Sequence, residues 1–213
     1  MANETDNIWE AMSTMRAMRR LKSDPVPDAL INKILQAGQW APSGGNTQKW
    51  RFLVVKDAAI KKQVQVYYKK LFDEVVGPRY ASSAPPPGSD EGRFKRQQAA
   101  VEYLTDHYHE APVWIVACLD AGENPNRTAG SSIYTAVENM LLATRALGLG
   151  TTLTTRHTGY GKEVDAVFGL PSGVQSYAIL PIGWPMGNFG KLGRGPLSDV
   201  VYGDKWGQPY KGL

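Results

Sequence analysis

Three short apolar runs, far apart along the chain, constrain the fold most. They are "RFLVVKD", "APVWIVACLD" and "VQSYAILPIGWP", and they contain the β-branched and aromatic residues that favour strands. Longer stretches with helical spacing of apolar residues lie before and between these runs, such as "DALINKILQAGQWAPS" and "TAGSSIYTAVENMLLATRALGLG". Strands that alternate with helices, without an internal repeat, predict one α+β domain over residues 1–213, with a small sheet flanked by several helices.

The N-terminal stretch predicts a helix whose end is positively charged. In "DNIWEAMSTMRAMRRL" the apolar residues recur at helical spacing as far as Met15, after a cap at Asp6 or Asn7. The end of this helix would bring together Arg16, Arg19 and Arg20. Arginine suits phosphate recognition, but on these residues alone a basic end that complements the helix dipole is the simpler explanation.

Two segments contain too little apolar sequence, or too many turn residues, for regular structure of their own. Residues 77–92, "GPRYASSAPPPGSDEG", interrupt the helical pattern with proline, glycine and serine. Loops of this length in a compact domain are usually functional or disordered, so we interpret the segment as a surface excursion that could act as a lid. The tail over residues 196–213 contains little that could fold alone.

Composition excludes several classes of protein. The 213 residues are 42% hydrophobic and 21% charged, as in ordinary globular proteins, and the net charge of +4 suits an anionic ligand without by itself indicating nucleic acid. Because Cys118 is the single cysteine, a disulfide framework within the chain is excluded. We interpret this cysteine as a packed, inert thiol. We find no signal peptide and no apolar stretch of membrane-span length. We expect a cytoplasmic protein without nucleic-acid or membrane partners.

Several catalytic and cofactor motifs are missing from the sequence. It has no G-x-G-x-x-G after a strand, no phosphate loop with its lysine and no G-x-S-x-G elbow. The three histidines, His107, His109 and His157, do not form a ligand-spaced cluster, so no metal site is predicted. We nominate no side chain as a catalytic acid, base or nucleophile.

Four separated segments could together hold one anionic, planar ligand. The arginines of "MRAMRRL" suit a phosphate, and the glycines of "APSGGN" allow a flat ring to approach the backbone closely. The segment "GLGTTLTT" adds small hydroxyl groups and backbone N–H groups at a strand. The late loop "GKLGRGPL" adds Arg194. Each segment is weak alone, and their order along the chain is the stronger observation.

In this order the segments resemble the nitroreductase family of FMN-dependent oxidoreductases. The resemblance covers nearly the whole chain and rests on "RAMRRLKSDPVPDALINKILQAGQWAPSGGNTQKWRFLVVKD", "APVWIVACLD", "ALGLGTTLTT" and "LPIGWPMGN" leading to "GRGPLSDVV". The "APSGGN" loop is also similar to the iodotyrosine deiodinase branch. The resemblance implies a nitroreductase-like fold with a mostly antiparallel sheet, in a homodimer whose subunits exchange helices and chain ends. It implies that residues 196–213 wrap the partner.

The resemblance also implies which residues bind FMN. The family's phosphate motif, Arg-x-Ser-x-Arg or Lys, falls on the segment that begins at Arg16 and ends at Arg20, where Met18 replaces the serine and one hydroxyl contact is lost. The "APS-G" loop would pack against the flavin ring from the second subunit, and "TTLTT" would face flavin N5. The cofactor-binding residues expected from the resemblance are Arg16, Ala17, Met18, Arg20, Pro42, Ser43, Gly44, Thr152, Leu153, Thr154 and Arg194.

The implied function is hydride transfer from NADH or NADPH through FMN to a small electron-poor acceptor, such as a nitroaromatic or a quinone, in a ping-pong cycle. One alternative is reductive dehalogenation, for which a lid bearing Glu, Tyr and Lys grips an amino-acid substrate. Glu74, Tyr80 and Lys69 are the available residues, but their spacing differs from the family's. A second alternative, kept open by Met18, is a flavin-binding module without enzymatic activity.

Overall fold

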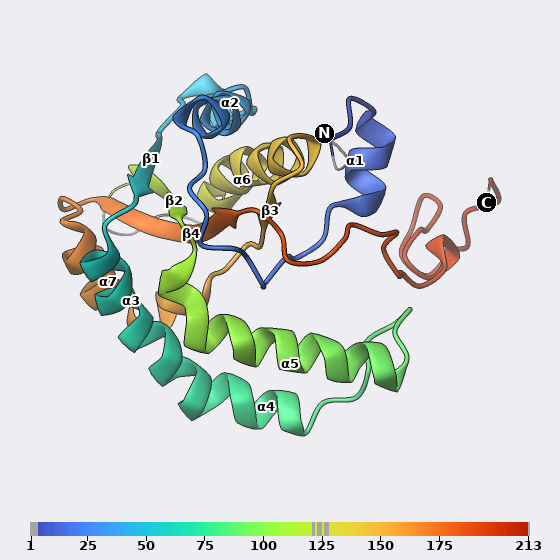
Figure 1. Ribbon diagram of the computed structural model, residues 1–213. Helices are drawn as coiled ribbons and strands as arrows, with labels where there is room; N and C mark the ends of the chain where they lie inside the picture. Colours follow the sequence, from blue (N-terminus) through green and yellow to red (C-terminus); the bar gives the residue numbers. More distant parts are fainter. Residues whose placement is uncertain (1–3, 121, 123–124, 126–127, 213) are drawn as a thin grey trace.

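The computed structural model describes residues 4–120, 122, 125 and 128–212, and it combines one sheet with helices on both of its faces (Figure 1). The sheet has the strand order β1-β2-β4-β3, and every neighbouring pair is antiparallel. The predicted α+β class and the mostly antiparallel sheet are therefore confirmed. The main elements along the chain are α1 (Ile8–Thr14), α2 (Asp28–Gln39), β1 (Trp50–Val55), α3 (Ala58–Leu71), α4 (Gly77–Ala81), α5 (Glu91–His107), β2 (Val113–Asp120), α6 (Ala129–Ala146), β3 (Gly150–Thr151), α7 (Gly161–Phe168) and β4 (Val174–Gly183).

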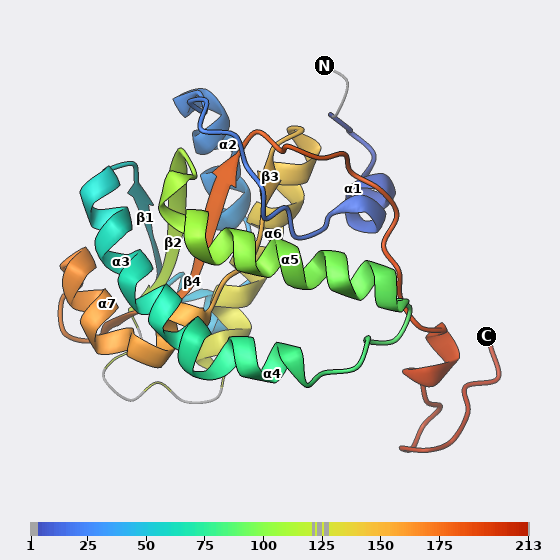
Figure 2. The ribbon, with the colours of Figure 1, turned by 60° about the horizontal axis from the view of Figure 1, so that its bottom comes forward.

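Strand β2 lies in the middle of the core because its side chains are buried on both faces. Val113 and Ile115 point into the core that α2 and α6 cover, and Trp114 and Val116 point into the core that α3, α5 and α7 cover. The alternation follows from the two-residue period of a strand. Figures 1 and 2 show the two helical layers, with α2 and α6 on one side of the sheet and α3, α4, α5 and α7 on the other.

Helices α2 and α6 pack closely because α2 carries a glycine at the contact. A Cβ atom on Gly38 would lie 2.9 Å from Cγ of Met140, which is closer than packed atoms approach. Pro27 directly precedes α2 without a capping hydrogen bond from its side chain, and Gly148 follows α6 with a φ of 71°, a backbone conformation that glycine adopts without steric cost.

Two predictions about local structure are wrong. The first helix ends at Thr14, so the arginines do not form a helix end. The chain instead runs to the sheet edge, where the backbone N–H groups of Met18 and Lys22 donate to Thr151 and Trp184. Residues 77–92 are not wholly irregular, since α4 is helical with Pro78 in its first turn, where the missing N–H costs nothing. Helix α5 then begins at Glu91, with the side chain of Asp90 as its cap.

The C-terminal tail lies apart from the body of the molecule in Figures 1 and 2. Its large apolar residues are exposed: Leu197 is 60%, Val200 71% and Trp206 88% exposed. Exposed apolar area costs about 25 cal/mol per Å², so such a surface favours a covering partner. Whether the tail wraps a second subunit stays a prediction.

The packing of α3 allows a matched test of the core. Val64 is completely buried, whereas Val66 on the same helix is 64% exposed. We expect Val64→Ala to lower the free energy of unfolding by roughly 1.5–3 kcal/mol, because two buried methyl groups are lost and a cavity remains. Val66→Ala is the control, with the same change of helix propensity. Urea unfolding that gives equal losses for the two variants would contradict the assigned orientation of α3.

Candidate functional site

The segment from Met15 to Lys22 is extended and lies along the edge of the sheet. The backbone N–H of Met18 donates to the carbonyl of Thr151 at 2.8 Å, and that of Lys22 donates to Trp184 at 2.8 Å. The N–H of Met186 donates back to the carbonyl of Arg20 at 3.1 Å. Two of the segments singled out in the sequence, the arginine motif and "TTLTT", therefore meet in space.

The arginines of this segment differ in burial and direction. Arg16 and Arg20 are exposed, whereas Arg19 is half-buried, and Ala17 and Met18 lie half-buried and buried between them. The Arg20 guanidinium lies 4.9 Å from the centre of the Tyr103 ring on α5. Among the described residues, no carboxylate forms an ion pair with any of these three arginines. Three cations without a counter-charge make this edge of the molecule suitable for an anion.

Arg194 comes to the same side of the molecule through its loop. The N–H of Leu192 donates to the carbonyl of Ser13 at 3.0 Å, which holds this loop beside the end of α1. The backbone of Arg194 also packs on the Pro-rich excursion, because a Cβ atom on Gly88 would lie 2.7 Å from the carbonyl carbon of Arg194. The Arg194 side chain is exposed, and its Nη1 donates to the carbonyl of Gly193 at 2.9 Å.

The predicted ring-edge residues are held firmly in place. Thr152 and Thr154 are buried, and Leu153 is 39% exposed. The Thr154 hydroxyl donates to the carbonyl of Ile179 at 2.7 Å and accepts from the Tyr108 hydroxyl at 2.6 Å. The hydroxyl oxygen of the preceding Thr151 is buried with no hydrogen-bond partner in the described structure, which leaves one polar atom available beside the arginine segment.

The loop expected to contact a ring lies elsewhere in the same chain. The N–H of Gly44 donates to the Ser132 hydroxyl at 3.1 Å, and the Thr135 hydroxyl donates to the carbonyl of Pro42 at 2.9 Å. The hydroxyl of Ser43 accepts from the backbone N–H of Gln48, five residues later, at 3.0 Å, and this bond shapes the loop. These bonds fix residues 42–44 to the first turns of α6, whereas Arg145, in its last turn, contacts Thr14 close to the arginine segment.

An aromatic and arginine stack, which the sequence did not indicate, lies beside Thr154. The Tyr68 ring stacks on that of Tyr108 at 4.0 Å, and the guanidinium of Arg156 lies 4.1 Å from the centre of the Tyr68 ring. Arg156 also lies 4.9 Å from the Phe72 ring. Burial lowers the pKa of Arg156 and raises that of Tyr68. In the sequence, the one signal that could have indicated this cluster is the charged residue Arg156, directly after "TTLTT".

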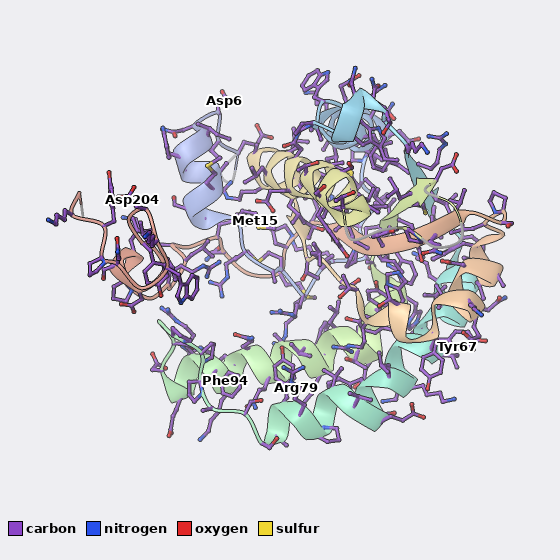
Figure 3. All side chains as sticks on the ribbon, turned by 180° about the vertical axis from the view of Figure 1, so that it is seen from behind. Asp6, Met15, Tyr67, Arg79, Phe94 and Asp204 are labelled. Atoms are coloured by element: carbon purple, nitrogen blue, oxygen red, sulfur yellow. The ribbon has the colours of Figure 1, made fainter. Side chains whose placement is uncertain are left out.

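The three residues considered for a deiodinase-like lid do not converge. The carboxylate of Glu74 accepts from the Tyr160 hydroxyl at 2.5 Å, and the ammonium group of Lys69 pairs with Asp73 at 3.5 Å and Asp106 at 3.2 Å. Tyr80, on α4, instead stacks near Phe94 of α5, with ring centres 6.3 Å apart. Figure 3 shows Phe94 on α5 and Arg79 on α4, in the layer that faces the segment beginning at Met15.

The histidines and the cysteine have structural environments. His157 is completely buried, with Nε2 3.1 Å from the Ser176 hydroxyl, which in turn donates to Asp165. Burial lowers the pKa of His157 to about 4 and raises that of Cys118 to about 12, so neither group is charged at neutral pH. Among the described residues, no group of three or more His, Cys, Asp or Glu side chains could hold a metal ion. In the same part of the chain, no helix is long and apolar enough to cross a membrane.

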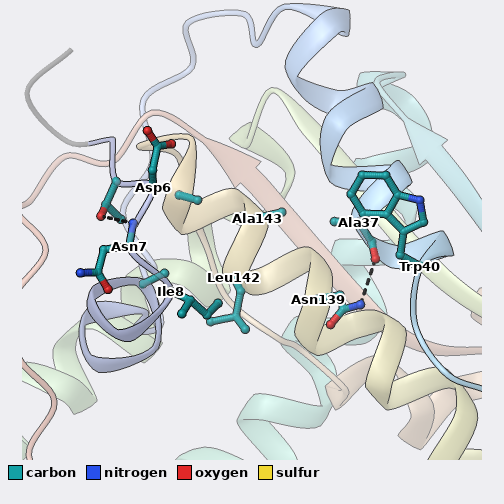
Figure 4. Close-up of a pocket in the computed structure, with 11 residues that line it drawn as sticks. Asp6, Asn7, Ile8, Ala37, Trp40, Asn139, Leu142 and Ala143 are labelled. Atoms are coloured by element: carbon teal, nitrogen blue, oxygen red, sulfur yellow. Dashed lines mark hydrogen bonds between the residues drawn. The ribbon is translucent and has the colours of Figure 1, made fainter.

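A shallow groove lies between α1 and α2, with α6 as its floor (Figure 4). Ile8 lines one side and Trp40 the other, and Leu142 lies between them on α6. Trp40 is 75% and Ile8 51% exposed, whereas the amide of Asn139 donates to the carbonyl of Ala37 at 3.0 Å. The groove is mostly apolar, and no lysine or arginine is among the described residues that line it, so it fits a protein surface better than an anion.

Comparison with known proteins decides which class of site this is. The model of the nitroreductase family matches residues 13–184, which is most of the chain and includes both the arginine segment and "TTLTT". The chain belongs to the nitroreductase family. The resemblance seen in the sequence is confirmed, and with it the general class, that of FMN-dependent oxidoreductases.

The relatives of this nitroreductase family member differ in their stated activities. It is 26% identical to an iodotyrosine deiodinase of Daphnia pulex over 92% of the chain and 66% of the relative, just under two thirds of that protein's length. It is 28% identical to an NADH dehydrogenase of Thermus thermophilus, over 87% of the chain and 90% of the relative. A crystal structure of oxidized iodotyrosine deiodinase bound to FMN and 3-iodo-L-tyrosine has the same fold, with a TM-score of 0.72 and 23% identity, covering 93% of the chain and 99% of that structure.

The buried His157 makes a pH-dependent prediction. Its pKa is about 4 in the native protein against an ordinary value of 6.5, so between these pH values the unfolded chain binds a proton that the native protein does not. The free energy of unfolding should therefore fall as the pH is lowered from about 6.5, by about 3 kcal/mol in full. Urea unfolding at pH 7 and pH 5 measures this loss. The loss should shrink in His157→Gln and persist in the control His107→Gln, whose side chain is 40% exposed. An unchanged loss in His157→Gln would contradict the prediction.

Proposed function

We propose that this nitroreductase family member binds FMN between Arg16, Arg20 and Arg194 at one end and Thr152–Thr154 at the other. One observation carries the proposal: arginines without acidic partners lie next to the short β-branched segment. The backbone hydrogen bond from Met18 to Thr151 holds the two segments together. Arginine donors match the phosphate oxygens. Beside this bond the Thr151 hydroxyl is buried and has no partner among the described residues.

The residues around the ring would position the flavin and would not transfer protons themselves. Bound FMN would supply two-electron redox chemistry between NADH or NADPH and an acceptor. The candidates to face flavin N5 are Thr152, Leu153 and Thr154. The hydroxyl of Thr154 is bonded to Ile179 and Tyr108, and these bonds would hold the segment in a constant position against the ring. One face of the ring would serve donor and acceptor in turn, which gives ping-pong kinetics.

The acceptor that fits this site best is a small, electron-poor molecule such as a nitroaromatic or a quinone. Dehalogenation is a second candidate because of the deiodinase relatives. It is disfavoured by Glu74 and Lys69, whose charged groups are bonded to Tyr160, Asp73 and Asp106 rather than presented together to a substrate. Turnover with a nicotinamide donor would separate both enzymatic candidates from a flavin-binding module without activity.

We propose further that the complete site needs two subunits. Residues 42–44 are bonded to the first turns of α6, whereas the arginine segment lies near its last turn, and a helix of 18 residues spans about 27 Å. A two-fold partner would bring its own loop to the flavin and bury the exposed apolar residues beside α6. Trp40, Ile8 and the tail residue Trp206 are the most suitable for such an interface.

The phosphate contacts can be tested by comparing FMN with riboflavin, which lacks the phosphate. We expect the purified protein to be yellow, with about one FMN per chain. Arg20→Ala should weaken FMN binding about ten- to a hundredfold, because a charge-assisted hydrogen bond is lost, and should leave riboflavin binding unchanged. The exposed Arg51, paired with Asp120 at 3.4 Å, provides the control Arg51→Ala. Fluorescence titration in which Arg51→Ala and Arg20→Ala behave alike would contradict the assignment, and protein that binds no FMN would overturn the proposed function.

The shared site can be tested with two lesions in different chains. A side chain added at Gly44 has room within its own subunit, since its Cβ atom would come no closer than 3.7 Å to Ser132, so Gly44→Trp should obstruct only the partner's ring. Homodimers of Arg20→Ala or of Gly44→Trp should each bind FMN poorly. The mixed dimer should recover one intact site, because both lesions then fall in the other.

The matched control places both lesions, Arg20→Ala and Gly44→Trp, in one chain and pairs it with the wild-type chain. Each site of that dimer contains one lesion, so neither should bind FMN well. If sites were formed within single chains, the outcome would be reversed: the mixed dimer would have no intact site and the control dimer would have one. FMN bound per dimer, measured by absorbance after gel filtration, distinguishes the two arrangements.

A further inference from the structure

Thr154 anchors the short segment that follows β3. Its backbone N–H donates to the carbonyl of Ile179 at 3.1 Å, and the N–H of Ile179 donates back to the carbonyl of Thr154 at 2.9 Å. The Thr154 hydroxyl donates to the same Ile179 carbonyl at 2.7 Å. Both donors of Thr154 are therefore used within the chain, and any donor to a flavin comes from its neighbours. Leu153 and Thr155, on either side of Thr154, are exposed.

The Thr154 hydroxyl also accepts a hydrogen bond from Tyr108. The two oxygens are 2.6 Å apart, and Tyr108 is the donor because the single hydroxyl hydrogen of Thr154 is given to Ile179. Tyr108 is completely buried, and burial raises the pKa of its hydroxyl well above the ordinary value. The phenol therefore keeps its proton, and this restraint on Thr154 is permanent.

Tyr108 is itself held by several neighbouring elements. Its ring stacks on that of Tyr68 of α3, with centres 4.0 Å apart, and lies 4.4 Å from the ring of Trp114 on β2. Nε1 of Trp114 donates to the backbone carbonyl of Tyr108 at 3.2 Å. Tyr108 also directly follows α5, which ends at His107. The position of its hydroxyl is thus fixed by packing, and Tyr108 passes that position to Thr154.

A second bond joins the same stretch to the end of α5. Nη1 of Arg156 donates to the Thr105 hydroxyl at 2.7 Å, and that hydroxyl donates to the carbonyl of Val101 at 2.8 Å. Residues 154–156 are therefore held to the end of α5 and the residue after it at two points. Loss of the Tyr108 bond alone would loosen the segment beside Leu153, while the Arg156 bond and the pairing with Ile179 maintain the local fold.

We propose that Tyr108 is a positioning residue that sets how strongly the protein distinguishes oxidised from reduced FMN. The proposal rests on the proposed FMN site and deepens it by naming a residue that acts on the flavin through Thr154, without contacting it. Flavin N5 accepts a hydrogen bond when oxidised and carries a hydrogen when reduced, so a group held rigidly at that edge favours one of the two forms. A segment that can shift accommodates both forms, and the preference becomes weaker.

The first experiment measures the potential of FMN bound to the protein against that of free FMN, which gives the ratio of the dissociation constants of the oxidised and reduced forms. In Tyr108→Phe this ratio should move toward one by about three- to tenfold, because a neutral buried hydrogen bond is lost. A tenfold change corresponds to about 30 mV for a two-electron couple.

Tyr68→Phe is the matched control for this measurement. The Tyr68 ring lies in the same buried stack, and the hydroxyl bonded to Thr154 is that of Tyr108. We expect the ratio in Tyr68→Phe to stay within about twofold of wild type, because no bond to the anchored segment is removed. A purely structural role for the two hydroxyls would lower the stability of both variants and leave both ratios at the wild-type value.

The second experiment tests the route through Thr154 and needs no turnover. Thr154→Val removes the hydroxyl that Tyr108 bonds and keeps the shape of the side chain. It should move the ratio toward one, and adding Tyr108→Phe to it should change the ratio no further, because the bond is already lost. In the flavin-free protein, amide hydrogen exchange over residues 151–156 should be faster in Tyr108→Phe than in Tyr68→Phe.

Each outcome decides the proposal. A wild-type ratio of one, or equal ratios in the wild type and Tyr108→Phe, overturns it while leaving the flavin function intact. Independent effects of Tyr108→Phe and Thr154→Val overturn the route through Thr154. If Tyr108→Phe does not fold, Thr154→Val decides alone, and an unchanged ratio in that variant overturns the proposal. Wild-type protein that binds no FMN refutes the proposed function first, before any variant is made.

Discussion

The candidate site depends on the backbone hydrogen bonds that hold residues 15–22 along the edge of the sheet. The bonds of Met18 to Thr151 and of Lys22 to Trp184 keep this segment extended, although its sequence has helical spacing. Successive side chains of extended backbone point to opposite sides. The Arg20 guanidinium consequently lies over the Tyr103 ring, and its side chain is exposed, whereas its neighbour Arg19 is half-buried. One set of tertiary bonds thus converts a run of basic residues into two separate cationic positions.

Helix α6 sets the second constraint, because it separates the two halves of the site within one chain. Its first turns bond to the loop at Pro42 and Gly44, and Arg145 in its last turn reaches back to Thr14. A straight helix cannot bring its own ends together, so a ring held by the arginine segment meets the loop only if a second copy supplies it. A second copy would also cover the exposed side chains of Trp40 and Ile8, which flank α6 and would otherwise remain in water.

How much could be predicted from the sequence depended on whether the information was local. The strands around Trp114 and the end of α6 at Gly148 follow from short patterns, and the arginine and threonine segments follow from ordered motifs. The end of α1 at Thr14 could not be predicted, because it depends on bonds to a distant strand. The stack of Arg156 on Tyr68 was missed for a related reason: it depends on the rotation of α3 against residues that come much later in the chain.

The chemistry of Arg156 follows from how its neighbours restrict it. The rings of Tyr68 and Phe72 lie against its guanidinium and favour positive charge electrostatically, but a ring offers no lone pair to an N–H group. One N–H is used by Thr105, which leaves donors in the plane of the group that the described residues do not satisfy. The tyrosine hydroxyls cannot supply a negative charge, because burial raises the pKa of Tyr68 and raises that of Tyr108 well above its ordinary value. Within the described structure, no acidic group therefore balances the positive charge of Arg156.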